Sequence, residues 1–409
     1  MNETVEYFKN IYGYTLEAWQ IKATEYFLYD KRDIIVKVRR GGRKSTWMDL
    51  MCLHSAVTVP NTFAIITSIG EDQGKEHIKQ IRRFLEQSPF TNMVVSPDTE
   101  TEINFNNKSR ILTIPQSAST RKGYHPTIKF VDELAAMDKS FYYEVVMPMG
   151  QTLRSPARTI ICSTPKLTDN AFKDLWFGRG NFIRIDVKTE DLPWISKEVL
   201  EQERDRMPEA LFRQECLGEF VPDTDMPFKP DVIDFIFKNT PVPKDHEVII
   251  GIDLARKRDY TAIAVAQKFG DFYHIPKIYR FQLHWDETVD TITQVCNEWK
   301  PVSVHIDATG VGDPITEELT EKLPYPIAPV VFTDRVKTNL ITHLTLLMEK
   351  GRLTVDPASK YPLYDELINF KYRNNTYHDD TVMALALAVN EEGRFNLVPL
   401  QLKDADKFI

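Results

Sequence analysis

The feature that most constrains the fold is an alternation of short apolar runs with helical stretches in the first half of the chain. The clearest helical patterns occupy residues 45–57 and 71–87. The apolar runs carry β-branched and other apolar residues at odd and even positions alike, as in strands buried on both faces of a sheet. They span 33–38, 62–68, 110–115, 127–133 and 159–165. This alternation predicts an α/β domain with a mainly parallel sheet and helices on both faces.

A second domain is expected beyond a proline-bearing boundary. Residues 186–220 have a mostly helical pattern, and two proline-containing stretches follow between 222 and 245. The rest combines strand patterns at 247–255, 261–269, 272–281 and 302–307 with helical patterns at 313–323, 338–351 and 378–392. We therefore expect a first α/β domain at 1–225, a linker at 226–245, a second α/β domain at 246–395 and a short tail at 396–409.

Composition excludes several classes of protein. The 409 residues include 51 basic and 59 acidic side chains, a formal net charge of −8, which excludes a general basic coat but not a local basic groove. The apolar runs are shorter than the roughly 18–20 residues that span a bilayer, and the first residues lack the pattern of a secretory signal. The cysteines form no CxxC pair, which indicates core residues in a reducing cytosol: Cys52, Cys162, Cys216 and Cys296.

A candidate phosphate loop lies at 38–46, VRRGGRKST, between a predicted strand and a predicted helix. Lys44 would reach the terminal phosphates of ATP, and Ser45 would hold Mg²⁺ through its hydroxyl. The match to the usual motif is imperfect, because Val38 replaces its first glycine and Arg43 directly precedes the lysine. Taken alone, the segment is more typical of a basic surface turn than of an ATP site. The backbone and side chains expected around ATP also include Gly41, Gly42 and Thr46.

The strand IKFVDE at 128–133 supports the ATP interpretation, because it ends in two carboxylates. Asp132 would hold Mg²⁺ and Glu133 would polarise the attacking water. An ordinary strand end would also explain the pair in isolation, but not as well once a phosphate loop lies upstream.

Further residues are weaker candidates for the same site. Trp19 and Gln20 could offer an aromatic face and an amide to adenine, and Ser163 and Thr164 in CSTP could sense the γ-phosphate. The arginines that could neutralise transition-state charge are Arg39, Arg40 and Arg121.

The second half carries five aspartates in a pattern typical of a metal-dependent nuclease. Asp253 and Asp307 each end a predicted strand, Asp259 follows the first of these strands, and Asp379 and Asp380 begin an apolar helix. Gathered carboxylates are costly unless cations neutralise them, and oxygen ligands of this kind suit Mg²⁺ or Mn²⁺. The pattern predicts a two-metal site for phosphodiester cleavage.

The roles of these aspartates differ in our interpretation. Asp253 would bridge the metals, and Asp259 would be an outer or second-metal ligand. Because adjacent residues at a helix start point about 100° apart, only one of Asp379 and Asp380 can face the metals squarely. We favour Asp379 as the ligand, with Asp380 capping the helix yet close enough to contribute.

In this order, the motifs resemble those of the large terminase subunits of tailed double-stranded DNA viruses, the ATP-driven motors that package genomes into capsids. The resemblance covers approximately residues 10–393. It rests on Gln20, RRGGRKS, FVDE, CSTP and FRQECLGEF, followed by GIDLARKRDYTA, HIDATGVGDP and HDDTVMALA. The last three together are highly specific, whereas the phosphate loop alone is not.

The resemblance implies an additional-strand P-loop ATPase domain followed by an RNase H-like nuclease domain, using ATP with Mg²⁺ and a two-metal Mg²⁺ or Mn²⁺ site. Arg40 falls where such motors carry an arginine used in hydrolysis, and Arg121 is our candidate for an arginine acting on a neighbouring subunit. Arg43 departs from the usual glycine and could crowd the phosphates, and Ser163 and Thr164 fall in the coupling motif.

The implied partners are double-stranded DNA, the portal protein of the procapsid, the small terminase subunit and further copies of the chain. Copies are expected to be monomeric in solution and to form a ring, expected to be pentameric, when assembled. The implied location is the host cytoplasm, transiently at the portal vertex, without membrane contact or a place in the virion. The alternatives are a helicase-like ATPase fused to an RNase H-like nuclease in repair or recombination, and a docking subunit that no longer hydrolyses ATP.

Overall fold

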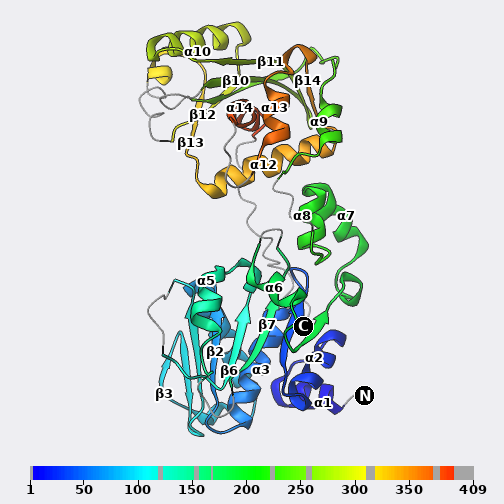
Figure 1. The fold of residues 1–409 in the computed structure, drawn as a ribbon, viewed down its shortest axis with the longest axis vertical. Coiled ribbons are helices and arrows are strands. Elements are labelled where there is room, and N and C mark those ends of the chain that lie inside the picture. Colours follow the sequence, from blue (N-terminus) through cyan, green and yellow to red (C-terminus); the bar gives the residue numbers. More distant parts are fainter. Residues whose placement is uncertain are drawn as a thin grey trace. The chain divides into compact units, whose positions relative to one another are not determined.

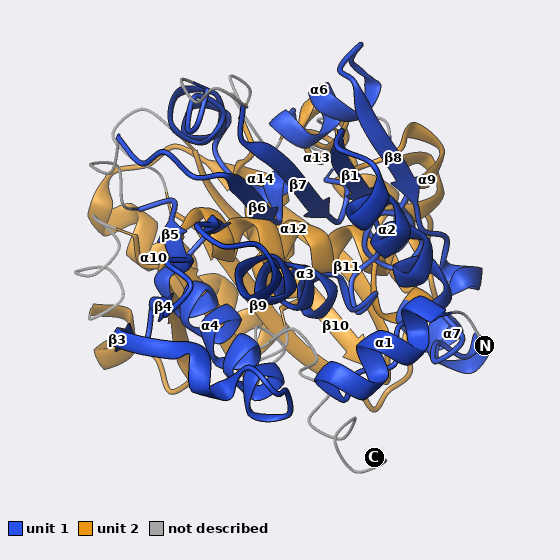
Figure 2. Cartoon of the chain, turned by 90° about the horizontal axis from the view of Figure 1, so that it is seen from below, with its two compact units in different colours: residues 1–203, 210–223 blue, residues 204–209, 224–409 orange. Residues whose placement is uncertain are grey.

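The computed structural model describes residues 3–117, 123–151, 156–166, 169–221, 226–254, 260–309, 318–371 and 378–390. The chain divides into two compact units, coloured blue and orange in Figure 2. Unit 1 comprises residues 1–203 and 210–223, and unit 2 comprises 204–209 and 224–409. No helix within the described residues is both long and apolar enough to cross a membrane.

Unit 1 is built on an eight-stranded sheet with the order β3-β4-β5-β2-β6-β7-β1-β8. Figure 1 labels β3, β2, β6 and β7 of this sheet. From β5 to β8 all neighbours are parallel, and the antiparallel pair β3–β4 extends one edge. The strands are β1 Asp33–Lys37, β2 Phe63–Ser68, β3 Val94–Thr99, β4 Glu102–Phe105, β5 Arg110–Pro115, β6 Ile128–Asp132, β7 Arg158–Ser163 and β8 Phe182–Asp186.

Helices cover both faces of this sheet, as the apolar strands predict. The α-helices that lie wholly in unit 1 are α1 Glu3–Tyr12, α2 Ala18–Tyr29, α3 Lys44–Thr58, α4 Glu71–Glu86, α5 Lys139–Phe141 and α6 Ala171–Phe177. The two further helices α7 Lys197–Arg206 and α8 Glu209–Glu215 lie mainly in unit 1, with residues 204–206 and 209 assigned to unit 2. Short 3₁₀ turns lie at Thr91–Met93, Leu134–Ala136 and Thr189–Asp191, and a π-helix lies at Tyr142–Val146. Alternate residues of β1 enter opposite cores: Ile34 and Val36 pack with α1–α4, and Ile35 packs with α6 and the π-helix.

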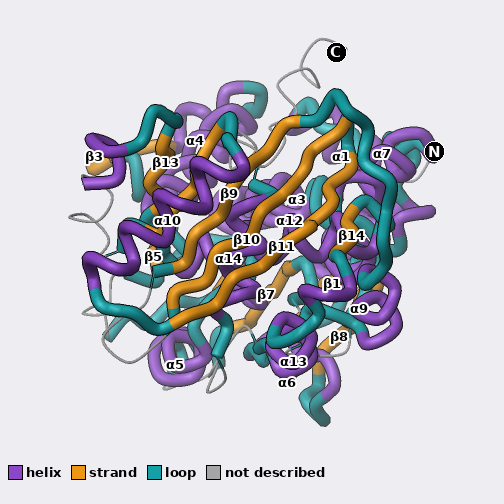
Figure 3. Tube along the Cα trace, turned by 90° about the horizontal axis from the view of Figure 1, so that it is seen from above, coloured by secondary structure: helices purple, strands orange, loops and turns teal. Residues whose placement is uncertain are grey.

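Unit 2 contains a six-stranded sheet with the order β13-β12-β9-β10-β11-β14, whose central strands run side by side in Figure 3. β9, β10 and β11 form an antiparallel meander, and β12, β13 and β14 join it in parallel. The strands are β9 Glu247–Asp253, β10 Thr261–Phe269, β11 Phe272–Phe281, β12 Ser303–Asp307, β13 Ile327–Val330 and β14 Leu353–Val355.

The helices of unit 2 also lie on both faces of their sheet. They are α9 Pro230–Ile236, α10 Trp285–Trp299, α12 Asp334–Glu349, α13 Leu363–Asn369 and α14 Asp380–Ala388, with a 3₁₀ turn at Pro357–Ser359. Along β10, Ala262 and Ala264 pack with α12, α13 and α14, whereas Ile263 and Val265 pack with α10. α14 is buried throughout, so it is the central helix of this unit.

Two expectations about the middle of the chain are corrected by the structure. The mostly helical pattern expected over 186–220 is wrong for its first third, where β8 ends at Asp186 and only a 3₁₀ turn follows before α7. Pro208 separates α7 from α8, because proline lacks the N–H that would continue a helix. Within the expected linker at 226–245, α9 buries Ile233 and Ile236 fully in the core of unit 2.

Candidate functional site: a phosphate loop and a carboxylate cluster

The loop after β1 has the backbone conformation that a phosphate loop requires. Gly41 has a φ of 75°, in the left-handed region that glycine tolerates best. At Gly42 an added Cβ would lie 2.2 Å from Cγ2 of Val38, so no larger residue fits without movement. The loop then enters α3 at Lys44, which directs the first N–H groups of the helix towards the loop.

Arg43 fills a position that also has a left-handed backbone, with a φ of 58°. Its guanidinium forms a 2.6 Å ion pair with Glu17 and stacks over the ring of Trp194 at 4.4 Å. The indole N–H of Trp194 in turn donates to the carbonyl of Gly41 at 3.2 Å. Arg43 is therefore engaged by Glu17 and Trp194, and sequence reasoning overlooked both partners.

Gln20, in the first turn of α2, holds the same loop. Its amide donates to the carbonyl of Arg43 at 3.2 Å, and its carbonyl accepts from the backbone of Glu17 at 3.0 Å. The side chain is fully buried. In this structure Gln20 therefore positions the phosphate loop, and its amide is not exposed for reading adenine.

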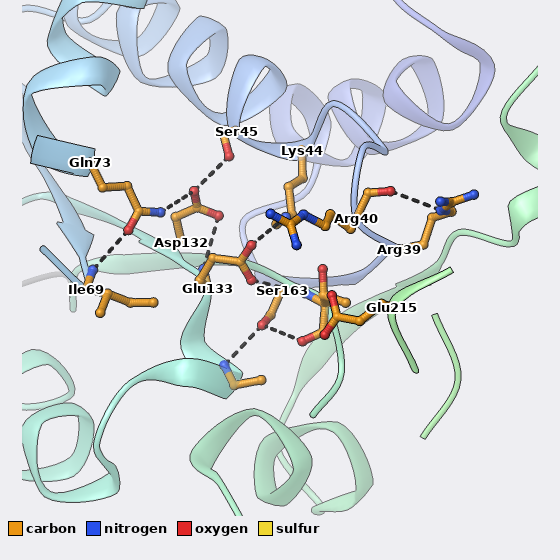
Figure 4. Close-up of polar contacts among 12 residues, drawn as sticks. Arg39, Arg40, Lys44, Ser45, Ile69, Gln73, Asp132, Glu133, Ser163 and Glu215 are labelled. Atoms are coloured by element: carbon orange, nitrogen blue, oxygen red, sulfur yellow. Dashed lines mark hydrogen bonds and ion pairs between the residues drawn. The ribbon is translucent and has the colours of Figure 1, made fainter. Parts of the chain in front are cut away.

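The loop meets the end of β6, and Figure 4 shows the four side chains that converge there. Lys44 forms a 2.7 Å ion pair with Glu133, and the hydroxyl of Ser45 donates to Asp132 at 2.7 Å. Lys44 and Asp132 are almost completely buried. Glu133 has a φ of 55°, an uncommon left-handed conformation for a residue with a side chain.

Burial and charge oppose each other in this cluster. Burial acts against the charged form of Lys44, but the nearby carboxylates of Glu133 and Asp132 outweigh it and raise the pKa of the ammonium. Burial likewise acts against ionised Asp132, but His77 and Lys44 hold its pKa below the usual value. The site therefore favours the charged forms of Lys44 and Asp132.

The CSTP segment lies beside this cluster because β7 neighbours both β6 and β1. The backbone N–H of Thr164 faces the second oxygen of Glu133 at 3.4 Å. Ser163 accepts from the N–H of Ala135 at 3.0 Å and donates to the carbonyl of Thr164 at 3.0 Å. These contacts link the residue after β6 to the end of β7, which is where a coupling segment would lie.

Two predicted nucleotide contacts are corrected. Trp19 is only 5 % exposed and packs against Trp47 in the core, so it offers no open aromatic face. Arg39 is 4 % exposed and pairs with Glu203 at 2.9 Å, so its charge is already neutralised within the fold.

Three further candidate residues for the nucleotide site remain: Arg40, Thr46 and Arg121. Arg40 is exposed at the loop, and Thr46 is partly buried in the first turn of α3. Arg121 lies outside the described residues.

Around Asp132 the structure adds residues that sequence reasoning missed. Gln73 donates to Asp132 at 3.4 Å, as Figure 4 shows, and the Nε2 atom of His77 lies 3.4 Å from the same oxygen. Asp49 contacts the other ring nitrogen of His77 at 2.7 Å. A buried acid in α3 and a buried histidine in α4 were the only signals, and local patterns do not indicate that such residues meet.

In unit 2, the aspartates that end β9 and β12 lie at one edge of the sheet. The two strands are parallel neighbours, with Ile252 in register with Ile306, so Asp253 and Asp307 follow at adjacent carboxyl ends. Asp307 is 5 % exposed and accepts the N–H of Thr309 at 2.8 Å. The paired strand ends explain how sequence positions more than fifty residues apart meet.

α14 brings the third carboxylate group to the same edge, because it packs directly on β9. Asp379 is the N-cap residue of α14, and Asp380 is its first residue. Asp380 is 3 % exposed and pairs with Arg280 at 3.0 Å. The predicted capping of the helix by Asp380 is wrong, since its carboxylate faces Arg280 and not the free N–H groups.

The cap of α14 comes from Glu366 in α13, a residue that sequence reasoning missed. One oxygen of Glu366 accepts from the N–H of Thr381 at 2.7 Å and from that of Val382 at 3.3 Å. Burial raises the pKa of this carboxyl. The helix that carries Asp379 and Asp380 is thus anchored by a carboxylate from outside its own sequence.

The carboxylates at this edge repel one another. Burial raises the pKa of Asp253 well above its usual value, and the charges of Asp307, Asp379 and Asp380 raise it further. Within the described ranges no three His, Cys, Asp or Glu side chains are already grouped so that they could hold a metal ion. Asp259 lies outside the described residues. Carboxylate oxygens are the donors that hard divalent cations prefer, and a bound cation would relieve this repulsion.

Comparisons with known proteins find similarity to phage large terminases, by sequence in part of the chain and by fold over most of it. Residues 250–392 match the family model "Terminase RNaseH-like domain". The chain is 32% identical over 211 residues to the large terminase subunits of Thermus phage G20c and Thermus virus P23-45. This match covers 46% of this chain and 42% of each relative, so it spans less than half of the relatives' length.

The fold extends beyond that matched segment. The solved large terminase of the thermophilic bacteriophage D6E aligns with a TM-score of 0.61 over 92% of this chain and 99% of that chain, at 14% identity. The α/β fold predicted from the sequence is therefore confirmed. The predicted resemblance is also confirmed: this chain has the fold of a phage large terminase, and residues 250–392 in its second unit match the terminase RNaseH-like domain.

Proposed function

We propose that this chain is a viral packaging enzyme that hydrolyses ATP in unit 1 to move double-stranded DNA into a procapsid. We further propose that unit 2 cuts concatemeric DNA into genome lengths with a divalent-metal-dependent nuclease. The observation that carries the proposal is the convergence of Lys44 and Ser45 with Asp132 and Glu133 at the carboxyl edge of the sheet.

The chemistry of these four side chains suits Mg²⁺–ATP. The hydroxyl of Ser45 and the carboxylate of Asp132, 2.7 Å apart, are oxygen ligands of the kind that Mg²⁺ prefers. Lys44 would bind the terminal phosphates, and Glu133 would orient the attacking water. When bound, Mg²⁺ would neutralise charge on the phosphates. The D6E large terminase, which shares this fold, has been solved with ADP and with ATP-γ-S.

Arg40 is the proposed arginine that acts on the nucleotide of its own subunit, because it is exposed at the loop. Its backbone N–H donates to the carbonyl of Glu215 at 3.1 Å, which holds the loop end in place while the side chain stays exposed. A charged guanidinium here could stabilise charge that develops on the phosphates during hydrolysis.

In unit 2, Asp253, Asp307 and Asp379 are the proposed ligands of two metal ions, with Asp259 as an outer ligand. Asp379 is favoured over Asp380 because Asp380 already pairs with Arg280. Mg²⁺ or Mn²⁺ bound here would activate a water and stabilise the leaving oxygen. The half-buried carboxylate of Asp253 would hold its position between the strands that frame it.

The proposed partners follow from packaging. Contacts to DNA should be made mainly to phosphates, since a motor must move over any sequence. The portal protein, the small terminase subunit and further copies of this chain in a ring complete the assembly. It would work in the host cytoplasm and transiently at the portal vertex.

The two activities can be separated by substitution. Lys44→Ala and Glu133→Gln should each lower ATP hydrolysis by about 10²-fold or more, because each removes a group that acts on the phosphates or the water. Asp253→Asn and Asp307→Asn should eliminate plasmid cleavage. Phosphate release and plasmid nicking by the purified chain measure the two effects.

Each pair of variants serves as the control for the other, because the sites lie in different units. Cleavage should persist in Lys44→Ala, and hydrolysis should persist in Asp253→Asn. Cleavage that survives EDTA would contradict the metal-dependent nuclease. Equal ATP turnover in wild type and Glu133→Gln would contradict the role of Glu133, and unwinding of a forked duplex would favour a helicase instead.

A further inference from the structure

Asp132 is held by more groups than the ATPase proposal uses. Its Oδ1 atom accepts the backbone N–H of Glu133 at 3.0 Å. Its Oδ2 atom accepts from Ser45 at 2.7 Å and lies 3.4 Å from both the amide of Gln73 and the Nε2 atom of His77. Both oxygens of the carboxylate thus have polar neighbours, in a side chain that is 1 % exposed.

His77 is itself fixed by a second carboxylate. Its Nδ1 atom lies 2.7 Å from Oδ1 of Asp49, and both side chains are 3 % exposed or less. Nε2 of His77 is buried and has no hydrogen-bond partner within the described residues, so Asp132 is the polar group that it faces. Asp49, His77 and Asp132 form a line of three buried groups that joins α3, α4 and the end of β6.

This line resembles the support that proteins give to metal ligands. Carboxylates that bind metals are commonly held by outer groups that fix their orientation, and loss of such a group typically weakens metal binding 10- to 100-fold. The simpler alternative is that Asp49 and His77 only tie α3 to α4. A link between the two helices alone would not need Asp132 beside the histidine. Apolar residues could also join the helices without burying charged groups.

We propose that Asp49 and His77 are positioning residues for the magnesium of bound nucleotide, with His77 fixing the carboxylate of Asp132 and Asp49 fixing the imidazole. The inference rests on the proposed ATP site. It predicts that these residues govern how much Mg²⁺ strengthens nucleotide binding, and not how tightly the loop binds nucleotide without metal.

The test is binding of a fluorescent ATP analogue to the purified full chain, in EDTA and over a series of Mg²⁺ concentrations. His77→Asn keeps an amide near Asp49 but removes the group facing Asp132, and Asp49→Asn keeps the size of the side chain. Each should raise the Mg²⁺ concentration for half-saturation about tenfold and change the affinity in EDTA less than twofold. His77→Gln restores a donor near Asp132 and should recover part of the loss.

His54→Asn is the matched control. His54 is also a buried histidine of unit 1. Its Nδ1 atom lies 3.0 Å from the hydroxyl of Tyr12, and among the described residues its side chain does not contact Asp132. Its variant should keep the wild-type Mg²⁺ dependence, and thermal melting should report the folding of every variant. If His77→Asn does not fold, Asp49→Asn alone decides.

The possible failures are distinct. If folded Asp49→Asn or His77→Asn needs the same Mg²⁺ concentration for half-saturation as the wild type, the inference is overturned. Equal weakening with and without metal would assign the pair a purely structural role and would also overturn it. Wild-type protein that does not bind nucleotide, or binds it independently of Mg²⁺, would instead overturn the proposed ATP site.

Discussion

At the scale of single residues, Asp253 shows how a carboxyl group crowded by other carboxyls links stability to pH. Burial and three neighbouring aspartates raise its pKa in the folded chain well above the ordinary 3.8. As pH rises past that ordinary value, the unfolded chain loses its proton first, so the free energy of unfolding falls until the raised pKa is passed. Each unit of difference corresponds to about 1.4 kcal/mol. A bound divalent cation removes this loss by stabilising the ionised form.

We therefore expect Mn²⁺ or Mg²⁺ to raise the melting temperature of the chain more at pH 8 than at pH 5, where protons compete with the cation. The difference should be several degrees, since about 1 kcal/mol shifts a domain of this size by 2–4 °C. Melting scans in EDTA and in cation at both pH values measure it. Asp253→Asn should lose most of the pH dependence, whereas an equal cation effect at both pH values would argue against the site.

At the scale of elements, the nuclease site depends on how closely α14 approaches β9. Gly251 lies beneath the helix, and an added Cβ would come within 2.2 Å of the carbonyl of Ala384 and of the N atom of Ala388. Because Gly251 has no side chain, α14 can pack close to β9, and this distance determines where Asp379 and Asp380 at the start of the helix lie.

Gly251→Ala should push α14 outward. It should lower the free energy of unfolding by about 1–3 kcal/mol, the usual cost of overpacking, and reduce DNA cleavage. Urea unfolding and plasmid nicking measure both effects. Gly180→Ala is the control, because Gly180 is exposed and an added Cβ would meet only the movable ring of Phe182 at 3.0 Å. Equal stability of the two variants would show that the helix can shift freely.

At the scale of the whole molecule, the proposed ring requires that one subunit act on its neighbour's nucleotide. Arg121 is the proposed arginine for that role. The free chain should hydrolyse ATP slowly and should speed up on assembly at a portal. In assembled rings, mixing Arg121→Ala with Lys44→Ala subunits should restore part of the hydrolysis that each lacks alone. Phosphate release by such mixed rings measures this, and rings without any recovery would exclude action between subunits.

The sequence by itself determined the strand and helix pattern of both units and the residues with the right chemistry, because those signals are local. Apolar runs such as 159–165 indicate a strand wherever they lie, and Lys44, Glu133 and Asp253 are recognisable from their immediate neighbours. The terminase-like order of motifs then predicted the fold, which the comparisons confirm.

Only the tertiary structure decided which of those residues are free to act. Arg39 and Trp19 have suitable chemistry for binding a nucleotide. However, Arg39 forms an ion pair with Glu203, and Trp19 packs against Trp47, so neither is available. The cap of α14 by Glu366 depends on where separate elements pack, and no local pattern encodes that. A side chain's type is set by the sequence, whereas its partners and burial are set by contacts between segments that only folding brings together.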